Sequence, residues 1–116
     1  MPISKFERSA GSPGDPLYRD LYSGLVRLHI LHHAVHEPIF GLGIIDELAR
    51  HGYKLSAGTL YPLLHGLERK GLLRSKESMA NGHSRRLYRA TPLGRKILKA
   101  AKVKVHELFG ELFEED

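Results

Sequence analysis

Apolar residues in the first part of the chain recur at the spacing of a helix. Between residues 17 and 36 they lie three or four positions apart, which predicts a first helix with one apolar stripe. The stripe consists of Leu21, Leu25, Leu28, Leu31 and Val35. Pro38 ends this helix, because the residue before a proline avoids the α conformation.

The same periodicity predicts two further helices. A second helix is expected over residues 42–51, and Gly52 follows it where a left-handed residue commonly caps a helix. Its inward positions are expected to be Ile44, Ile45, Leu48 and Ala49. A third helix follows Ser56, whose hydroxyl is suited to cap the first turn, and Gly71 closes it. Its core face is expected to consist of Leu60, Leu63, Leu64 and Leu67.

Pro62 lies within this third helix. A proline inside a helix removes one backbone hydrogen bond and crowds the preceding turn. The sequence therefore favours a helix that begins nearer Gly58, which would place Pro62 in its first turn.

Two strand-like segments and a last helix complete the chain. The strands are predicted at residues 72–78 and 85–91, and the Asn81-Gly82 pair in the intervening segment 79–84 supports a turn. Thr91 is expected to cap the last helix, with Pro92 at its first position. Apolar spacings of three and four along this helix form a seam typical of a coiled coil. The seam consists of Leu98, Ala101, Val105, Leu108 and Leu112, and Phe109 and Phe113 widen it.

The order helix, helix, helix, hairpin, helix predicts a mainly α fold with a small β-hairpin. This is a winged helix-turn-helix followed by one C-terminal helix. Residues 1–16 are expected to be a flexible N-terminal arm, residues 17–91 the winged helix-turn-helix domain, and residues 92–116 a dimerisation helix. The absence of cysteine excludes disulfides and thiolate metal sites, and no apolar run is long enough to span a membrane. A cytoplasmic protein with no membrane partner is expected.

Positive charge is concentrated in the middle of the chain. The net charge is +5, but residues 42–96 hold eleven basic groups against four acidic ones. A patch of one sign suits a polyanion such as nucleic acid. It also fits an acidic protein, so a winged-helix protein-interaction module is an alternative.

The third helix and the hairpin carry the side chains expected to contact DNA. Hydroxyl groups at the start of this helix suit phosphate oxygens, and His65 is placed to reach a base edge. Basic residues on the hairpin suit a neighbouring phosphate strand or the minor groove. The residues predicted from this pattern are Lys54, Ser56, Thr59, Tyr61, Pro62, His65, Arg69, Lys76, Arg85 and Arg86.

Three segments resemble the signature of PadR-family transcriptional regulators. They are LSAGTLYPLL at 55–64, LERKGLL at 67–73 and RRLYRATPLG at 85–94, within a resemblance that covers roughly residues 21–100. The resemblance implies a winged helix-turn-helix with the 55–64 segment near DNA and Tyr88 of the wing close by. It also implies a repressor that dimerises through its first and last helices, and release from DNA by a small molecule.

The dimer interface predicted from the resemblance and the apolar seam consists of Leu21, Leu25, Leu28, Leu98, Ala101, Val105, Leu108, Phe109 and Leu112. The chain departs from the family pattern at Phe40-Gly41-Leu42, where a His-Gly-Tyr step is usual. Its last helix is single and short, so a small-molecule inducer is expected to bind between the helices of the dimer.

Four histidines on the first helix are candidate metal ligands. His29 with His33, and His32 with His36, have the i, i+4 spacing that can chelate Zn²⁺, Ni²⁺ or Cu²⁺, and Glu37 could supply an oxygen. Histidines at the wet edge of a dimer interface are the competing interpretation. A metal-responsive regulator is therefore a second alternative, although no cofactor is expected.

The sequence contains no convincing catalytic arrangement. Ser56 and His65 resemble a nucleophile and a base, but nine helical positions place them about 13 Å apart. We therefore expect no enzyme. The predicted function is a sequence-specific, duplex-DNA-binding transcriptional regulator that acts as a homodimeric repressor.

Overall fold

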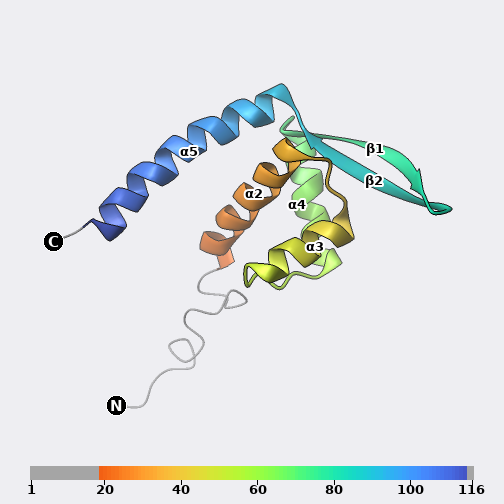
Figure 1. The fold of residues 1–116 in the computed structure, drawn as a ribbon, viewed down its shortest axis with the longest axis horizontal. Helices are drawn as coiled ribbons and strands as arrows, with labels where there is room; N and C mark the ends of the chain where they lie inside the picture. The colour runs from red at the N-terminus through yellow and green to blue at the C-terminus, as the bar shows by residue number, and fades with distance from the viewer. Residues whose placement is uncertain (1–18, 115–116) are drawn as a thin grey trace, which may run out of the picture.

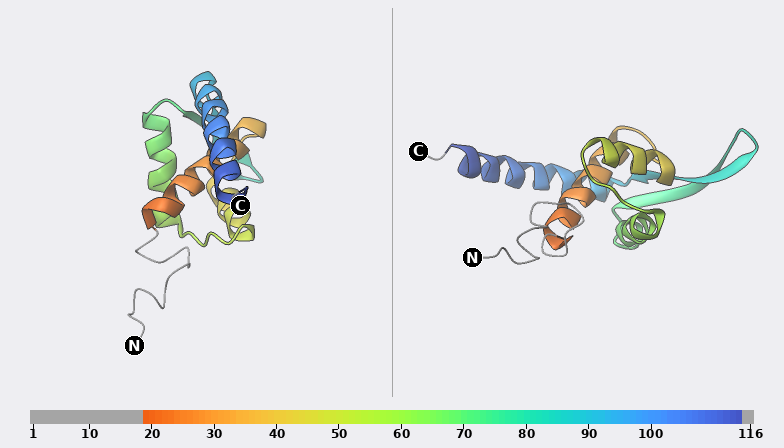
Figure 2. Two further views of the ribbon diagram at one scale, coloured as in Figure 1. Left: turned by 90° about the vertical axis from the view of Figure 1, so that its left-hand side faces the viewer. Right: turned by 90° about the horizontal axis from the view of Figure 1, so that it is seen from below.

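The structure is a computed structural model that describes residues 19–114, so the predicted arm at 1–16 lies outside the described residues. The elements are α2 (Arg19–His36), α3 (Gly41–Arg50), α4 (Ala57–Arg69), β1 (Leu73–Ala80), β2 (His83–Ala90) and α5 (Pro92–Phe113). The predicted order and the winged helix-turn-helix class are confirmed. The hairpin and the C-terminal part of α5 project from opposite sides of the helical body (Figure 1, Figure 2).

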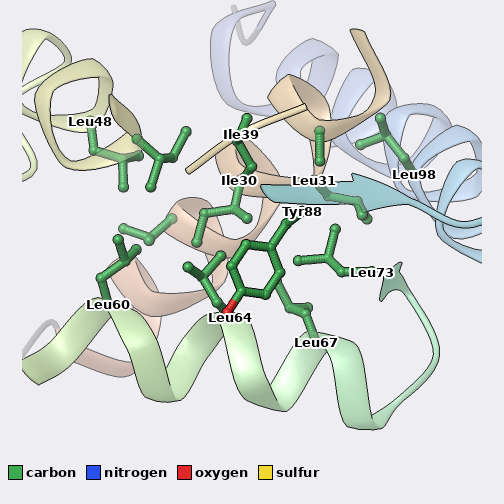
Figure 3. Packing of buried hydrophobic residues seen from close by; sticks show 13 residues of the cluster. Ile30, Leu31, Ile39, Leu48, Leu60, Leu64, Leu67, Leu73, Tyr88 and Leu98 are labelled. Atoms are coloured by element: carbon green, nitrogen blue, oxygen red, sulfur yellow. The ribbon is translucent and has the colours of Figure 1, made fainter. Parts of the chain in front are cut away.

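The core lies between α2, α3, α4 and the root of the hairpin (Figure 3). From α2 it takes Val26, Ile30, Leu31 and Ala34, all of which are buried. Two residues of the predicted apolar stripe lie outside the core, since Leu21 is 63% exposed and Leu25 is 40% exposed, whereas Leu28 and Val35 pack against it. The predicted stripe therefore faces the core along most of the helix and is uncovered only near the start of the helix.

Helix α3 contributes Ile44 and Leu48 to the core, as the periodicity predicted. Ala49 was expected to face inward and this was wrong, because it follows Leu48 by one position, about 100° around the helix, and is exposed. Gly52 has a φ of +89°, which confirms the left-handed residue expected after this helix.

Helix α4 begins at Ala57, one residue after its predicted cap. Ser56 Oγ accepts a hydrogen bond from the Thr59 amide at 3.2 Å, and this cap fixes the start of the helix. The expectation that Pro62 would lie in the first turn is therefore wrong. Pro62 lies in the second turn, where its missing N–H removes one helical hydrogen bond on an exposed side.

The hairpin is longer than the sequence predicted. Its strands pair from Leu73 with Ala90 to Ala80 with His83, so the expected six-residue connection shrinks to Asn81-Gly82. Both turn residues have positive φ, 52° and 77°, the conformation of a type I′ turn whose twist lets the pairing continue to its edge. Ile39 extends this pairing, because its backbone exchanges hydrogen bonds of 2.9 and 2.8 Å with Tyr88.

Thr91 caps α5 as predicted. Its hydroxyl oxygen accepts a hydrogen bond from the Gly94 amide at 2.9 Å and donates one to the Gly71 carbonyl, so it joins the end of the hairpin to the end of α4. Within residues 19–114, none of the helices combines the length and apolarity that crossing a membrane requires.

Candidate nucleic-acid interface

The outward face of α4 presents the side chains that the sequence predicted for it. Because the leucines at 60, 64 and 67 are buried, the opposite positions of the helix face solvent. Exposed residues of this region are Lys54, Ser56, Thr59, Pro62, His65 and Arg69. They form a strip without acidic residues along one side of the helix, a surface that accommodates an anionic partner.

The first turn of α4 holds its hydroxyl groups close together. Ser56 Oγ lies 3.3 Å from Thr59 Oγ1, in addition to accepting the Thr59 amide. Free backbone amides at a helix start attract anions, and these two exposed hydroxyls lie beside them. The arrangement is suited to a phosphate oxygen.

A series of contacts connects the wing to α4 through the start of α3. The Arg85 guanidinium lies over the ring of Phe40, 4.1 Å from its centroid. Phe40 is the N-cap of α3, and the next residue, Gly41, packs against the Tyr61 ring of α4. The Tyr61 ring in turn lies 6.2 Å from that of His65. The wing at Arg85 and the exposed face of α4 are therefore parts of one continuous surface.

Glu68 joins α4 to the hairpin on the other side. Its carboxylate accepts hydrogen bonds from the Ser75 amide at 3.0 Å and from Ser75 Oγ at 2.7 Å. Arg86 then donates to Ser75 Oγ at 3.2 Å and lies 3.8 Å from the Glu77 carboxylate. Arg86 therefore has partners within the wing, which reduces the charge that it presents to a ligand.

The position of Tyr88 contradicts its predicted contact with DNA. Its side chain is 1% exposed and packs beside Leu64 and Leu67 (Figure 3), so it is not available to contact DNA. Strand residues alternate between the two faces of a hairpin, and the register places Tyr88 on the inner face. Burial, and secondarily the Glu68 carboxylate, raises the pKa of the Tyr88 phenol, which keeps it neutral.

Comparison with known proteins agrees with the fold and the surface described above. A family model described as the transcriptional regulator PadR-like family matches residues 30–100. This chain belongs to the PadR-like family of transcriptional regulators. It is 48% identical over 94 residues to the transcriptional regulator Rv3488 of Mycobacterium tuberculosis, across 81% of this chain and 88% of that protein.

Solved structures support the same assignment. A PadR family transcriptional regulator from Eggerthella lenta is 32% identical, with a TM-score of 0.71 over 86% of this chain and 91% of that one. A transcriptional regulator from Clostridium thermocellum is 26% identical, with a TM-score of 0.67 over 82% and 92% of the two chains. The protein is a transcriptional regulator and not an enzyme, as the sequence predicted, and the family implies that it binds DNA.

The hairpin carries two further exposed arginines, Arg74 and Arg89. Arg74 and Arg89 are register partners across the hairpin. The alternation of strand residues puts them on the same face as Lys76 and Arg85, opposite the face of Tyr88. Their pairing depends on the strand register, which the two-residue turn at Asn81-Gly82 sets.

The histidines of α2 form two groups that touch where the His32 ring lies 5.2 Å from the His33 ring, centroid to centroid. His29 and His33 lie beside His51 at the end of α3, and one nitrogen from each of the three rings lies within 4.8 Å of the others. His32 and His36 contact each other, with ring centroids 4.6 Å apart, outside this group. The sequence predicted the spacing of His29 and His33, but it did not predict that His51 joins them.

The local environment keeps imidazoles neutral in both groups. Burial, and next the neighbouring His51, lowers the pKa of His29. Burial, and next the neighbouring His36, lowers the pKa of His32. Neutral imidazole is the form that binds metal ions.

Proposed function

We propose that this regulator binds duplex DNA sequence-specifically as a homodimer and represses transcription. The observation that carries the proposal is the continuous surface from the first turn of α4 to the wing, joined by the stacking of Arg85 on Phe40. Helix α4 enters the major groove, and the hairpin follows the adjacent backbone. This docking is the one expected when the second helix of a helix-turn-helix is the reading helix.

Roles within this surface divide by position. Ser56 and Thr59, at the positive end of the helix dipole, bind phosphate oxygens and fix the register on the duplex. Arg69 and the wing residues Lys76, Arg85 and Arg86 add non-specific charge contacts. His65 lies in the middle of the exposed face and contacts a base edge, so it carries sequence preference.

The homodimer rests on the uncovered apolar face of α5. After Leu98, no side chain within residues 99–113 is fully buried, although the stretch includes Val105, Leu108, Phe109 and Leu112. An isolated helix of this length is marginal in water, and its stability comes from packing an apolar face. A second copy supplies such packing, and Leu21 and Leu25 of α2 are further exposed apolar residues that it could cover.

Two-fold symmetry makes the operator a pseudo-palindrome with half-sites about 10 bp apart or a multiple of that. The test is selection of bound duplexes from a random pool at a stated, near-physiological salt concentration, since salt controls such affinities. Enrichment of a pseudo-palindrome is the expected result. Recovery of unrelated sequences would refute sequence-specific binding and would turn attention to an acidic protein as the partner of this surface.

The proposal also includes repression of transcription, a cellular compartment and a small-molecule inducer. A regulator of transcription acts where the DNA is, so the cytoplasm is its proposed compartment. An inducer is proposed to bind between the helices of the dimer. Loss of operator binding on addition of a small molecule, with the dimer retained, is the measurement that identifies one.

A further inference from the structure

Two helices present pairs of metal-binding side chains to each other. On α2 the pair is His29 and His33, and on α3 it is Glu47 and His51, where His51 is the C-cap residue. Residues four positions apart lie on the same side of a helix, so each pair can hold one ion from one side. The first pair was recognisable from its spacing, but the second becomes a partner only because α3 packs against α2.

The distances bring three imidazoles together, with one carboxylate oxygen beside two of them. A tetrahedral Zn²⁺ with bonds of about 2.1 Å places its ligand atoms about 3.4 Å apart. Glu47 Oε1 lies 3.7 Å from His33 Nε2 and 3.5 Å from His51 Nε2, close to that separation. One nitrogen from each imidazole lies within 4.8 Å of the others. The imidazoles therefore need to approach by about 1.4 Å at most, which side-chain rotation can supply.

The surroundings of the Glu47 carboxylate also suit its role as a metal ligand. The other oxygen of Glu47, Oε2, accepts a hydrogen bond from Arg50, which leaves Oε1 directed toward the imidazoles. Partners of this kind orient a metal-binding carboxylate and are part of many metal sites. The His29 and His51 rings are stacked with centroids 4.8 Å apart, so the cluster is already assembled.

We propose that His29, His33, His51 and Glu47 form a binding site for a divalent transition-metal ion, with Zn²⁺ the best fit to the ligand set. Three imidazole nitrogens and one carboxylate oxygen are borderline ligands that suit Zn²⁺ in tetrahedral geometry. The ion ties α2 to the end of α3, the first helix of the helix-turn-helix. His32 and His36 are not part of this site.

The test measures metal binding by tag-free protein in the absence of DNA, so its outcome does not depend on the proposed operator. Zn²⁺ titration by calorimetry is expected to show one site per chain, and Co²⁺ is expected to give the visible absorption of a tetrahedral ion. His51→Ala and Glu47→Gln should each lower the Zn²⁺ affinity at least tenfold. The matched control is the double change His32→Ala and His36→Ala, which removes an equally spaced pair from the same helix and should keep the affinity within about twofold of wild type.

Folding is checked separately by circular dichroism and thermal unfolding of the metal-free variants. If His51→Ala does not fold, His29→Gln, which keeps a polar side chain on the surface of α2, takes its place in the comparison. Zn²⁺ is expected to raise the melting temperature of wild type and of the control, but not that of the site variants. The proposal is overturned if the control loses binding while His51→Ala retains it, or if wild type binds neither ion.

Discussion

The ring of Tyr61 occupies the space that a side chain at Gly41 would need. A Cβ built on Gly41 would overlap the Tyr61 phenol, with Cε1 of the ring 3.0 Å away. Gly41 is the first residue of α3, and Tyr61 lies on α4 beside the exposed face that we propose to enter DNA. The close approach of these two helices therefore sets where the Tyr61 ring lies.

Replacement of Gly41 by alanine should destabilise the protein by about 1–3 kcal/mol, because a methyl group at this buried position overpacks the contact between α3 and α4. Urea unfolding of the two proteins measures the difference. Gly58→Ala is the matched control, since a Cβ there meets one atom, Ser56 Oγ, at an ordinary 3.8 Å. The control should be neutral or slightly stabilising. A loss no larger than that of the control would show that the Tyr61 ring does not oppose the added methyl group.

Removal of the Arg85 side chain should weaken binding to all duplex sequences alike and lower the salt slope by about one unit. The reason is that Arg85 is proposed to contact the DNA backbone and to read no base. Competition binding across a range of salt concentrations measures both quantities. Glu77→Gln is the counterpart, because it removes the carboxylate that pairs with Arg86 and should strengthen binding to all sequences. An Arg85→Ala variant that changes sequence preference would contradict the assigned role.

His65→Ala is expected to act differently, by relaxing sequence preference at one operator position. The loss of one base contact should cost about 1–3 kcal/mol of discrimination there, with little change in the salt slope. Repeating the random-pool selection with the variant shows whether that position loses its preference. If His65→Ala and Arg85→Ala weaken binding in the same way, the division between base and backbone contacts is wrong.

Local features of this fold were predictable from the sequence because each depends on a few neighbouring residues. Ser56 and Thr91 cap their helices through hydroxyl groups, and both act within three residues of their own position. Gly52 and the Asn81-Gly82 turn follow from residues that tolerate positive φ. These short-range rules located all the described elements to within a few residues.

Features that depend on packing between elements were not predictable in the same way. The placement of Tyr88 in the core depends on strand register, and a shift of one residue would turn it outward. The meeting of His29 with His51 depends on how α3 lies against α2. Spacing within one helix therefore revealed half of the proposed metal site and also suggested His32 and His36, which lie outside it.

The burial of Tyr88 gives a direct test of its structural role. Tyr88→Phe keeps the ring in the core and should leave DNA affinity unchanged within about twofold, whereas Tyr88→Ala should cost about 3–5 kcal/mol of stability. Unfolding and DNA-binding measurements on both variants separate the two effects. A folded Tyr88→Phe protein with much weaker DNA binding would show that the phenol reaches the DNA after all.

The proposed dimer predicts that a charge introduced on the apolar side of α5 disrupts association, whereas a charge introduced on the opposite side does not. Leu108 is 52% exposed and belongs to the apolar seam, so Leu108→Glu should dissociate the dimer by burying a carboxylate against a second copy. Val103 is 64% exposed and lies two positions from Ala101, about 200° around the helix, so Val103→Glu should leave the dimer intact. Sedimentation velocity measures the association state of each variant, and circular dichroism reports whether α5 remains helical. Because neither side chain is part of the core of one chain, a difference in association identifies the seam as the interface, whereas a dimer that persists in Leu108→Glu would place the interface elsewhere.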